Sequence, residues 1–181
     1  MSTKPATQTR CAYSGCASHA VGMAEFCWVH LPDKNSYRMH IQDLIAEGAD
    51  LSGINLQKVD LRDLHLGKGR LAKADLSQAY LAGAQLFDAD LEGADLIGSI
   101  LSDADLTHCN MRNTDLTKAR LRNARLWNAE LTAANLSECD LSGADLWNAR
   151  LFNTKLWHTN FKDVKSFTRR NFSRDIPLRS R

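Results

Sequence analysis

The sequence predicts an all-β solenoid, in which short extended segments wind into coils stacked along one axis. Every fifth residue from Leu51 to Phe161 is large and apolar, and the only two that are not leucine are Met111 and Phe161 itself. Two residues before each of them stands a side chain that is mostly small and most often Ala, although Ile54, Val59 and Leu64 are large, and the residue between is most often Asp or Asn. No residue is inserted or lost along the run, so one geometry must repeat throughout it.

A period of five residues fits neither an α-helix, which repeats every 3.6 residues, nor a flat strand, which repeats every two. Four sides of five residues would close a square coil of about twenty residues, and such coils stack about 4.8 Å apart through backbone hydrogen bonds. The Leu and Ala positions then point inward and the other three positions point to solvent. Residues twenty apart are therefore expected to stack on the same face.

The repeated pattern Ala-Asp/Asn-Leu-X-X, as in Ala74-Asp75-Leu76 and Ala134-Asn135-Leu136, closely resembles the pentapeptide-repeat family. Repeats this regular do not arise by chance. The resemblance implies a right-handed quadrilateral parallel β-helix, which we expect over residues 49–165. It also implies that the outer faces of the coil carry the function.

The N-terminal part combines a polar segment, residues 1–10, which we expect to be disordered, with a candidate zinc-binding module at residues 11–35. The module holds three thiols and an imidazole with the spacing C-x4-C-x10-C-x2-H: Cys11, Cys16, Cys27 and His30. These are the ligands of a closed tetrahedral Zn²⁺ site, and a segment too short for its own core can take its folding energy from a structural zinc ion. His19 is a competing fourth ligand, and a disulfide or unliganded thiols are alternatives.

Residues 36–48 are predicted to form a capping helix over the N-terminal end of the coil. Its apolar side chains fall on one helical face, at Tyr37, Ile41, Leu44 and Ile45. Asp33, Asn35 or Ser36 could cap the helix start, and Gly48 is a natural stop. A cap is expected because an open coil end would expose leucines and unpaired backbone groups.

Charge is unevenly distributed along the chain, although the net charge is only +2. Residues 51–161 carry 12 Lys or Arg against 14 Asp or Glu, whereas residues 162–181 carry 7 against 2. We therefore expect a basic C-terminal tail at residues 166–181. A basic patch is also expected in the middle coils, either paired with adjacent acidic side chains or contacting a phosphate or an acidic partner; it comprises Arg112, Lys118, Arg120, Arg122 and Arg125.

Two sets of outward side chains are candidate partner contacts. The first is a stacked column of carboxylates, Asp75, Asp95 and Asp115. The second gathers aromatic side chains toward the C-terminal end, at Trp127, Trp147, Phe152 and Trp157. The carboxylates could instead bond the backbone of their own turns. The aromatic side chains could mark a contact surface, stack on one another, or be covered by the tail.

The sequence contains no Gly-rich phosphate loop, nucleophile elbow or paired carboxylates in a cleft, so it predicts a non-enzymatic scaffold that binds an unidentified protein partner. Some pentapeptide-repeat proteins resemble DNA in shape and charge and bind type II topoisomerases, so a DNA-mimicking modulator of gyrase is the alternative. Direct nucleic-acid binding is disfavoured because residues 11–30 contain Glu25 and no Lys or Arg.

No apolar run approaches the ~18 residues that span a bilayer, and the start of the chain has no apolar signal segment. We therefore expect a cytoplasmic protein. Some relatives place such a coil in a larger, membrane-bound protein, and the sequence leaves that possibility open.

Overall fold

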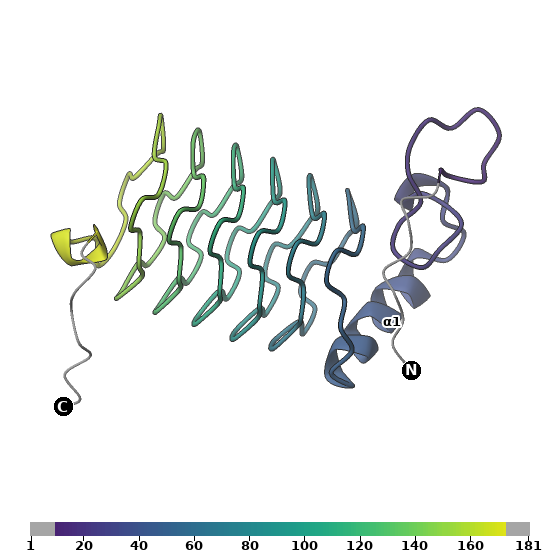
Figure 1. The fold of residues 1–181 in the computed structure, drawn as a ribbon, viewed down its shortest axis with the longest axis horizontal. Helices are drawn as coiled ribbons and strands as arrows, with labels where there is room; N and C mark the ends of the chain where they lie inside the picture. Colours follow the sequence, from purple (N-terminus) through teal and green to yellow (C-terminus); the bar gives the residue numbers. More distant parts are fainter. Residues whose placement is uncertain (1–9, 173–181) are drawn as a thin grey trace.

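The computed structural model describes residues 10–172, and its main body is a stack of coils with helical segments at both ends (Figure 1). In chain order the helical elements are the 3₁₀-helix η1 (Trp28–His30), the α-helix α1 (Lys34–Ala46) and the 3₁₀-helix η2 (Arg169–Phe172). Most of the expected disordered N-terminus, residues 1–9, and the end of the expected basic tail, residues 173–181, lie outside the described residues. Within residues 10–172, no helix is long and apolar enough to cross a membrane.

The coils are joined by isolated parallel bridges between residues twenty apart, from Asp50–Arg70 to Asp145–Lys165. Each five-residue side contributes one bridge residue, so four sides complete a coil. The predicted stacking of residues twenty apart is therefore confirmed. Over the described residues the coils are linked by these single bridges, and no continuous strand forms.

The interior of the coil is filled by the residues that the five-residue period places there. Leu76, Leu96 and Leu116 are at most 1% exposed, and the intervening alanines are equally buried. Cys109 and Cys139 occupy two of the small inward positions, and burial raises the pKa of both thiols to about 12. These two cysteines are therefore core residues.

The backbone N–H groups of each side find acceptors in a fixed pattern, and this explains the Asp or Asn before each leucine. On the side 96–100, three N–H groups donate to carbonyls of neighbouring coils, and a fourth donates to the Leu96 carbonyl. The remaining one, of Ile97, lies at the corner and donates to Oδ1 of Asp95 at 2.9 Å. A short carboxylate or amide side chain thus replaces a backbone acceptor at the turn.

Helix α1 is fixed at both ends by local contacts. Asp33 caps its start, because Asp33 Oδ1 accepts the Ser36 N–H at 2.9 Å. At its end Gly48 takes a φ of +75°, and its N–H donates to the Ile45 carbonyl. The helix begins two residues before the predicted start because Asp33, the earliest of the three candidate caps, is the residue used.

Helix α1 packs across the first coil (Figure 1) and satisfies backbone groups that have no preceding coil to pair with. Ile41 is fully buried in the core that the helix shares with the coil. Gln42 Oε1 accepts the His65 N–H at 3.0 Å, and the Arg38 guanidinium donates to the Arg62 carbonyl at 2.7 Å. The helix therefore caps an edge that would otherwise expose unpaired polar groups.

The C-terminal end of the coil is closed by one side chain, Asn171 of η2. It is 3% exposed, and its Nδ2 donates to the carbonyls of Leu146 and Ala149, each at 2.9 Å. The backbone carbonyl of Asn171 accepts the Leu151 N–H at 2.6 Å. Asn171 thus takes over the hydrogen bonds that a further coil would have made.

Candidate metal centre and outer faces

Four side chains converge in the N-terminal module, the segment of residues 11–33 that precedes α1. The candidate ligand atoms of Cys11, Cys16, Cys27 and His30 all lie within 4.8 Å of one another. His30 Nδ1 is 3.5 Å from Cys11 Sγ and 3.4 Å from Cys27 Sγ. Cys16 Sγ is 3.8 Å from Cys27 Sγ. The fold therefore brings together the four residues that the sequence spacing singled out.

These distances match the edges of a tetrahedral zinc site. Zinc–sulfur bonds of about 2.3 Å and zinc–nitrogen bonds of about 2.05 Å at tetrahedral angles give edges of about 3.8 Å for S···S and about 3.6 Å for S···N. Three of the six separations, those of Cys11–His30, Cys27–His30 and Cys16–Cys27, are within about 0.2 Å of these values. The donor set therefore fits a zinc ion, and with four protein ligands no position stays open for a substrate.

Local backbone structure places the candidate ligand side chains near one another. Cys27 and His30 bracket η1, and the His30 N–H donates to the Cys27 carbonyl at 3.0 Å. Side chains three apart in a 3₁₀ turn lie above one another, so both point the same way. The Cys11 N–H donates to the Ser18 carbonyl, and the Tyr13 ring stacks on the His30 imidazole at 4.0 Å.

The pKa values of the Cys11 and Cys27 thiols shift in opposite directions. Burial raises the pKa of Cys11, but backbone hydrogen bonds with Cys27 and Tyr13 and side-chain bonds with His30 and Cys27 lower it to about 6. Burial is also the main influence on Cys27 and raises the pKa of that thiol. The hydrogen bonds that lower the pKa of Cys11 favour its thiolate, which is the form that binds metal.

The structure also tests two alternatives to a Cys3His site, a role for His19 as the fourth ligand and a disulfide. His19 is exposed and lies outside the cluster, so the imidazole that joins the thiols is that of His30. All five cysteines are free thiols in residues 10–172. The sulfur atoms of Cys16 and Cys27 are 3.8 Å apart, whereas a disulfide needs about 2.05 Å.

The N-terminal module is tied directly to the first coil. The Gly22 N–H donates to the Asn55 carbonyl at 2.5 Å, and Asn55 Nδ2 donates to the Ala20 carbonyl at 2.6 Å. Val21, between them, is 1% exposed and belongs to the core of the coil. A Cβ at Gly22 would lie 2.3 Å from the Tyr37 hydroxyl, so only glycine allows this approach.

Trp127 and Trp147 form a contacting pair on the outer surface. Their ring centroids are 6.4 Å apart at 75°, and the residues are 40% and 56% exposed. Phe152 and Trp157 follow on the next two sides of the coil. The described residues as far as Phe172 leave the Trp pair exposed.

The predicted carboxylate column is present as a continuous run of bridges, Asp75–Asp95–Asp115. In each, Oδ1 accepts the N–H two residues further on, so these side chains bond their own turns. Burial raises the pKa of Asp95, and the charges of Asp75 and Asp115 raise it further, although its bond with the Ile97 N–H acts against this. The column therefore combines a structural role with mutual repulsion.

The charges of the predicted basic patch are largely neutralised by acidic side chains of neighbouring coils. Four of its five cations have a carboxylate within 4.0 Å; the pairs are Arg112–Glu130, Lys118–Glu138, Arg122–Asp140 and Arg125–Asp105. Arg120, which bridges Ile100 and Asp140, makes no ion pair within residues 10–172. It is therefore the cation of the patch that is available to a partner.

A family model of pentapeptide repeats matches the chain in 8 copies, over residues 70–103, 89–128, 99–137 and 129–165. Together these matches span more than half of the sequence. The chain belongs to the pentapeptide-repeat family. Proteins of this family are generally structural or interaction modules rather than enzymes.

Several solved structures are similar to this pentapeptide-repeat chain. One, from the thylakoid lumen of Arabidopsis thaliana, is 31% identical, with a TM-score of 0.42 and coverage of 58% of this chain and 69% of that one. Rfr23 of the cyanobacterium Cyanothece 51142 is 28% identical, with a TM-score of 0.43 and coverage of 72% and 93%. QnrB1, a plasmid-mediated fluoroquinolone resistance protein, is 17% identical, with a TM-score of 0.34 and coverage of 66% and 76%. No curated protein matches the chain.

Sequence reasoning missed two features of this pentapeptide-repeat protein. Asn171 lies after the repeat and has no pattern around it, so only the packed end of the coil reveals its role. The second is a pocket where the outward Tyr80 faces the N-terminal module. Tyr80 stands at a position that most often holds Asp or Asn. This departure from the repeat is the feature of the sequence that could have indicated the pocket.

Proposed function

We propose that this protein is a non-enzymatic scaffold that binds a protein partner on the outer faces of a rigid coil. The coil is proposed to have the right-handed, four-sided winding of its family. A structural Zn²⁺ ion held by Cys11, Cys16, Cys27 and His30 is proposed to fix the N-terminal module. The proposed location is the cytoplasm, where thiol ligands stay reduced.

The observation that carries the proposed binding function is the exposed Trp127–Trp147 pair. The coil interior is filled by Leu and Ala side chains, so residues 51–151 leave no internal room for a substrate. Indole rings that stay exposed and in mutual contact are typical anchors of protein interfaces. Phe87 is an exposed aromatic side chain on the same column, nearer to the N-terminal end of the coil.

The proposal is tested by quantitative affinity capture with the full chain as bait. The double variant Trp127→Ala and Trp147→Ala should lose a specific set of proteins by about tenfold or more, as expected for the loss of two interface anchors. Thr107→Ala, on the same column between the aromatic side chains, is the matched control and should retain that set. Equal capture by all baits, with unchanged circular dichroism, would reject the Trp pair as the contact surface.

The second candidate is a DNA-mimicking modulator of gyrase, and the observation that favours it is the aligned column Asp75–Asp95–Asp115. A mimic needs a strong field of one sign, and the cations of the adjacent patch weaken that field. A supercoiling assay with purified gyrase separates the two candidates. Inhibition or protection that is lost in Asp95→Asn would favour the mimic, and no effect at micromolar concentrations would remove it.

A further inference from the structure

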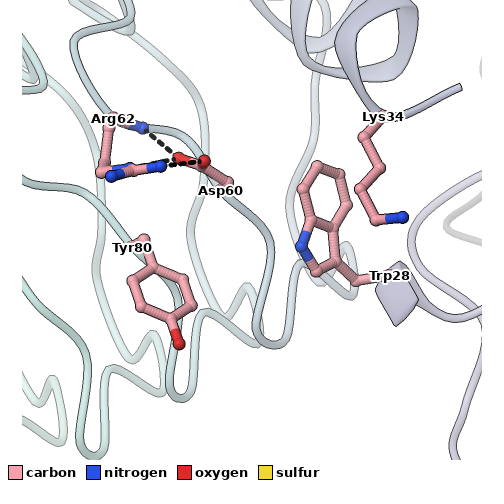
Figure 2. Close-up of a pocket in the computed structure, with 5 residues that line it drawn as sticks. All are labelled: Trp28, Lys34, Asp60, Arg62 and Tyr80. Atoms are coloured by element: carbon pink, nitrogen blue, oxygen red, sulfur yellow. Dashed lines mark hydrogen bonds and ion pairs between the residues drawn. The ribbon is translucent and has the colours of Figure 1, made fainter.

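A pocket of about 250 Å³ lies where the N-terminal module meets the coil. Figure 2 shows Trp28 and Lys34 on one side of it, and Tyr80 with the Asp60–Arg62 ion pair on the other. Trp28 belongs to η1, and Tyr80 extends outward from the second coil. Two aromatic rings from different parts of the molecule thus line one opening.

The pocket continues into an apolar strip along the coil. Tyr80 is 44% exposed, and it bridges Asp60 on one side and Ile100 on the other. Ile100 in turn bridges Arg120. Since bridged residues lie about 4.8 Å apart, the strip from Tyr80 to Arg120 is about 10 Å long.

Positive charge is left over at both ends of this strip. At the pocket, Arg62 and Asp60 neutralise each other, because the Arg62 guanidinium donates to Asp60 at 2.9 and 2.7 Å, and the positive charge left over is that of Lys34. Lys34 Nζ lies 5.8 Å from the centre of the Trp28 ring and meets only neutral carbonyls through its hydrogen bonds. At the far end Arg120 has no ion pair among the described residues. The groove is therefore apolar in the middle and positive at its ends.

We propose that this groove binds an extended acidic peptide segment of a partner protein. One aromatic or aliphatic side chain enters the pocket between Trp28 and Tyr80, and carboxylates on either side of it pair with Lys34 and with Arg120. The pocket is smaller than the roughly 300–1,000 Å³ of typical small-molecule sites, and this favours a single side chain as the occupant. The site goes beyond the proposed function, because a whole side of the coil separates it from the Trp127–Trp147 pair.

The test is selection of random peptides from a display library against the full chain as purified, followed by affinity measurement with fluorescent copies of the enriched peptides. Enriched sequences should carry an apolar residue flanked by Asp or Glu. Their affinity should fall about tenfold or more in Trp28→Ala and in Arg120→Glu, and it should weaken with added salt. Arg120→Glu changes an exposed side chain of the coil, so it remains informative if Trp28→Ala disturbs the N-terminal module.

A matched control localises the effect. Lys155→Glu reverses a cation at an equivalent bridge position on another side of the coil, and it should change affinity less than about twofold. The proposal is overturned if no peptide is enriched, if enriched peptides lack acidic residues, or if they bind Arg120→Glu as tightly as the wild type. It is also overturned if single-stranded DNA binds tighter than the peptides and shows the same sensitivity to these variants.

Discussion

The N-terminal module and the coil are stabilised in opposite ways. In the coil the same few contacts recur: a large inward side chain and backbone bonds to the neighbouring coils on each side, and on many sides an Asp or Asn that bonds the corner N–H. In the module no contact recurs, and four side chains drawn from residues 11–30 must meet at one point. A defect in the coil is thus shared among many equivalent contacts, whereas the loss of one ligand in the module leaves nothing to replace it.

The largest effect is expected from removal of a metal ligand. Purified protein should contain about one zinc per chain, and Cys27→Ser should lose it, because zinc binding contributes on the order of 10 kcal/mol to the folding of small zinc modules. Hydrogen exchange should then show lost protection in residues 11–31 and in the first coil, through the Gly22–Asn55 contact. Metal analysis and exchange mass spectrometry measure both.

Cys139→Ala is the control for the ligand variant, since Cys139 is buried in the coil away from the cluster. It should keep the full zinc content. A wild-type protein with less than about a tenth of an equivalent of zinc would reject the structural metal site.

A cavity in the coil should have the next largest effect. Leu96→Ala should destabilise the protein by about 2–5 kcal/mol, because Leu96 is fully buried and its neighbours on the two adjacent coils cannot close the space. Ile97 is the next residue in the sequence but is exposed, so Ile97→Ala should lower the free energy of unfolding by less than about 0.5 kcal/mol. Denaturant titration of both variants measures the difference, and equal costs would contradict the inward placement of Leu96.

A smaller and local effect is expected at the C-terminal end. Asn171→Ala leaves the carbonyls of Leu146 and Ala149 without their bonds, which should cost about 1–3 kcal/mol in the last coils. Lys162→Ala is the control, because Lys162 is an exposed residue of the last coil. Hydrogen exchange of residues 141–165 should rise in the first variant and stay unchanged in the second.

The smallest effect concerns the carboxylate column and depends on pH. Because the pKa of Asp95 is raised in the folded state, its ionisation opposes folding as the pH rises through that pKa. Asp95→Asn keeps an acceptor for the Ile97 N–H and removes repulsion, so it should stabilise the protein by a few tenths of a kcal/mol at pH 7. That gain should vanish at a pH low enough to protonate the native carboxyl.

Asp105→Asn provides the opposite case, because Asp105 pairs with Arg125 at 2.6 Å. This variant should be neutral or slightly destabilising at pH 7, as the loss of an exposed ion pair predicts. Thermal unfolding of the two variants at pH 7 and at low pH compares them directly, and a destabilising Asp95→Asn would contradict the repulsion.

Much of the fold could be predicted because the coil is periodic. Once Leu76 and Leu96 are assigned to the interior, the same geometry fixes every residue twenty apart, and this placed the Asp75–Asp95–Asp115 column correctly. The start of α1 was two residues off because several side chains could cap it. Asn171 and the Tyr80 pocket could not be predicted, since each depends on contacts between segments with no shared pattern.

The sequence by itself determined the period, the inward and outward sides of the coil and the three candidate thiol ligands, because these follow from residue type and spacing along the chain. Only the tertiary structure decided that His30 rather than His19 meets the three thiols, that Arg120 lacks an ion pair among the described residues, and that Trp28 faces Tyr80. The physical reason is that each of these depends on the distance between side chains that are far apart in the sequence, and packing and hydrogen bonding set that distance only in the folded protein.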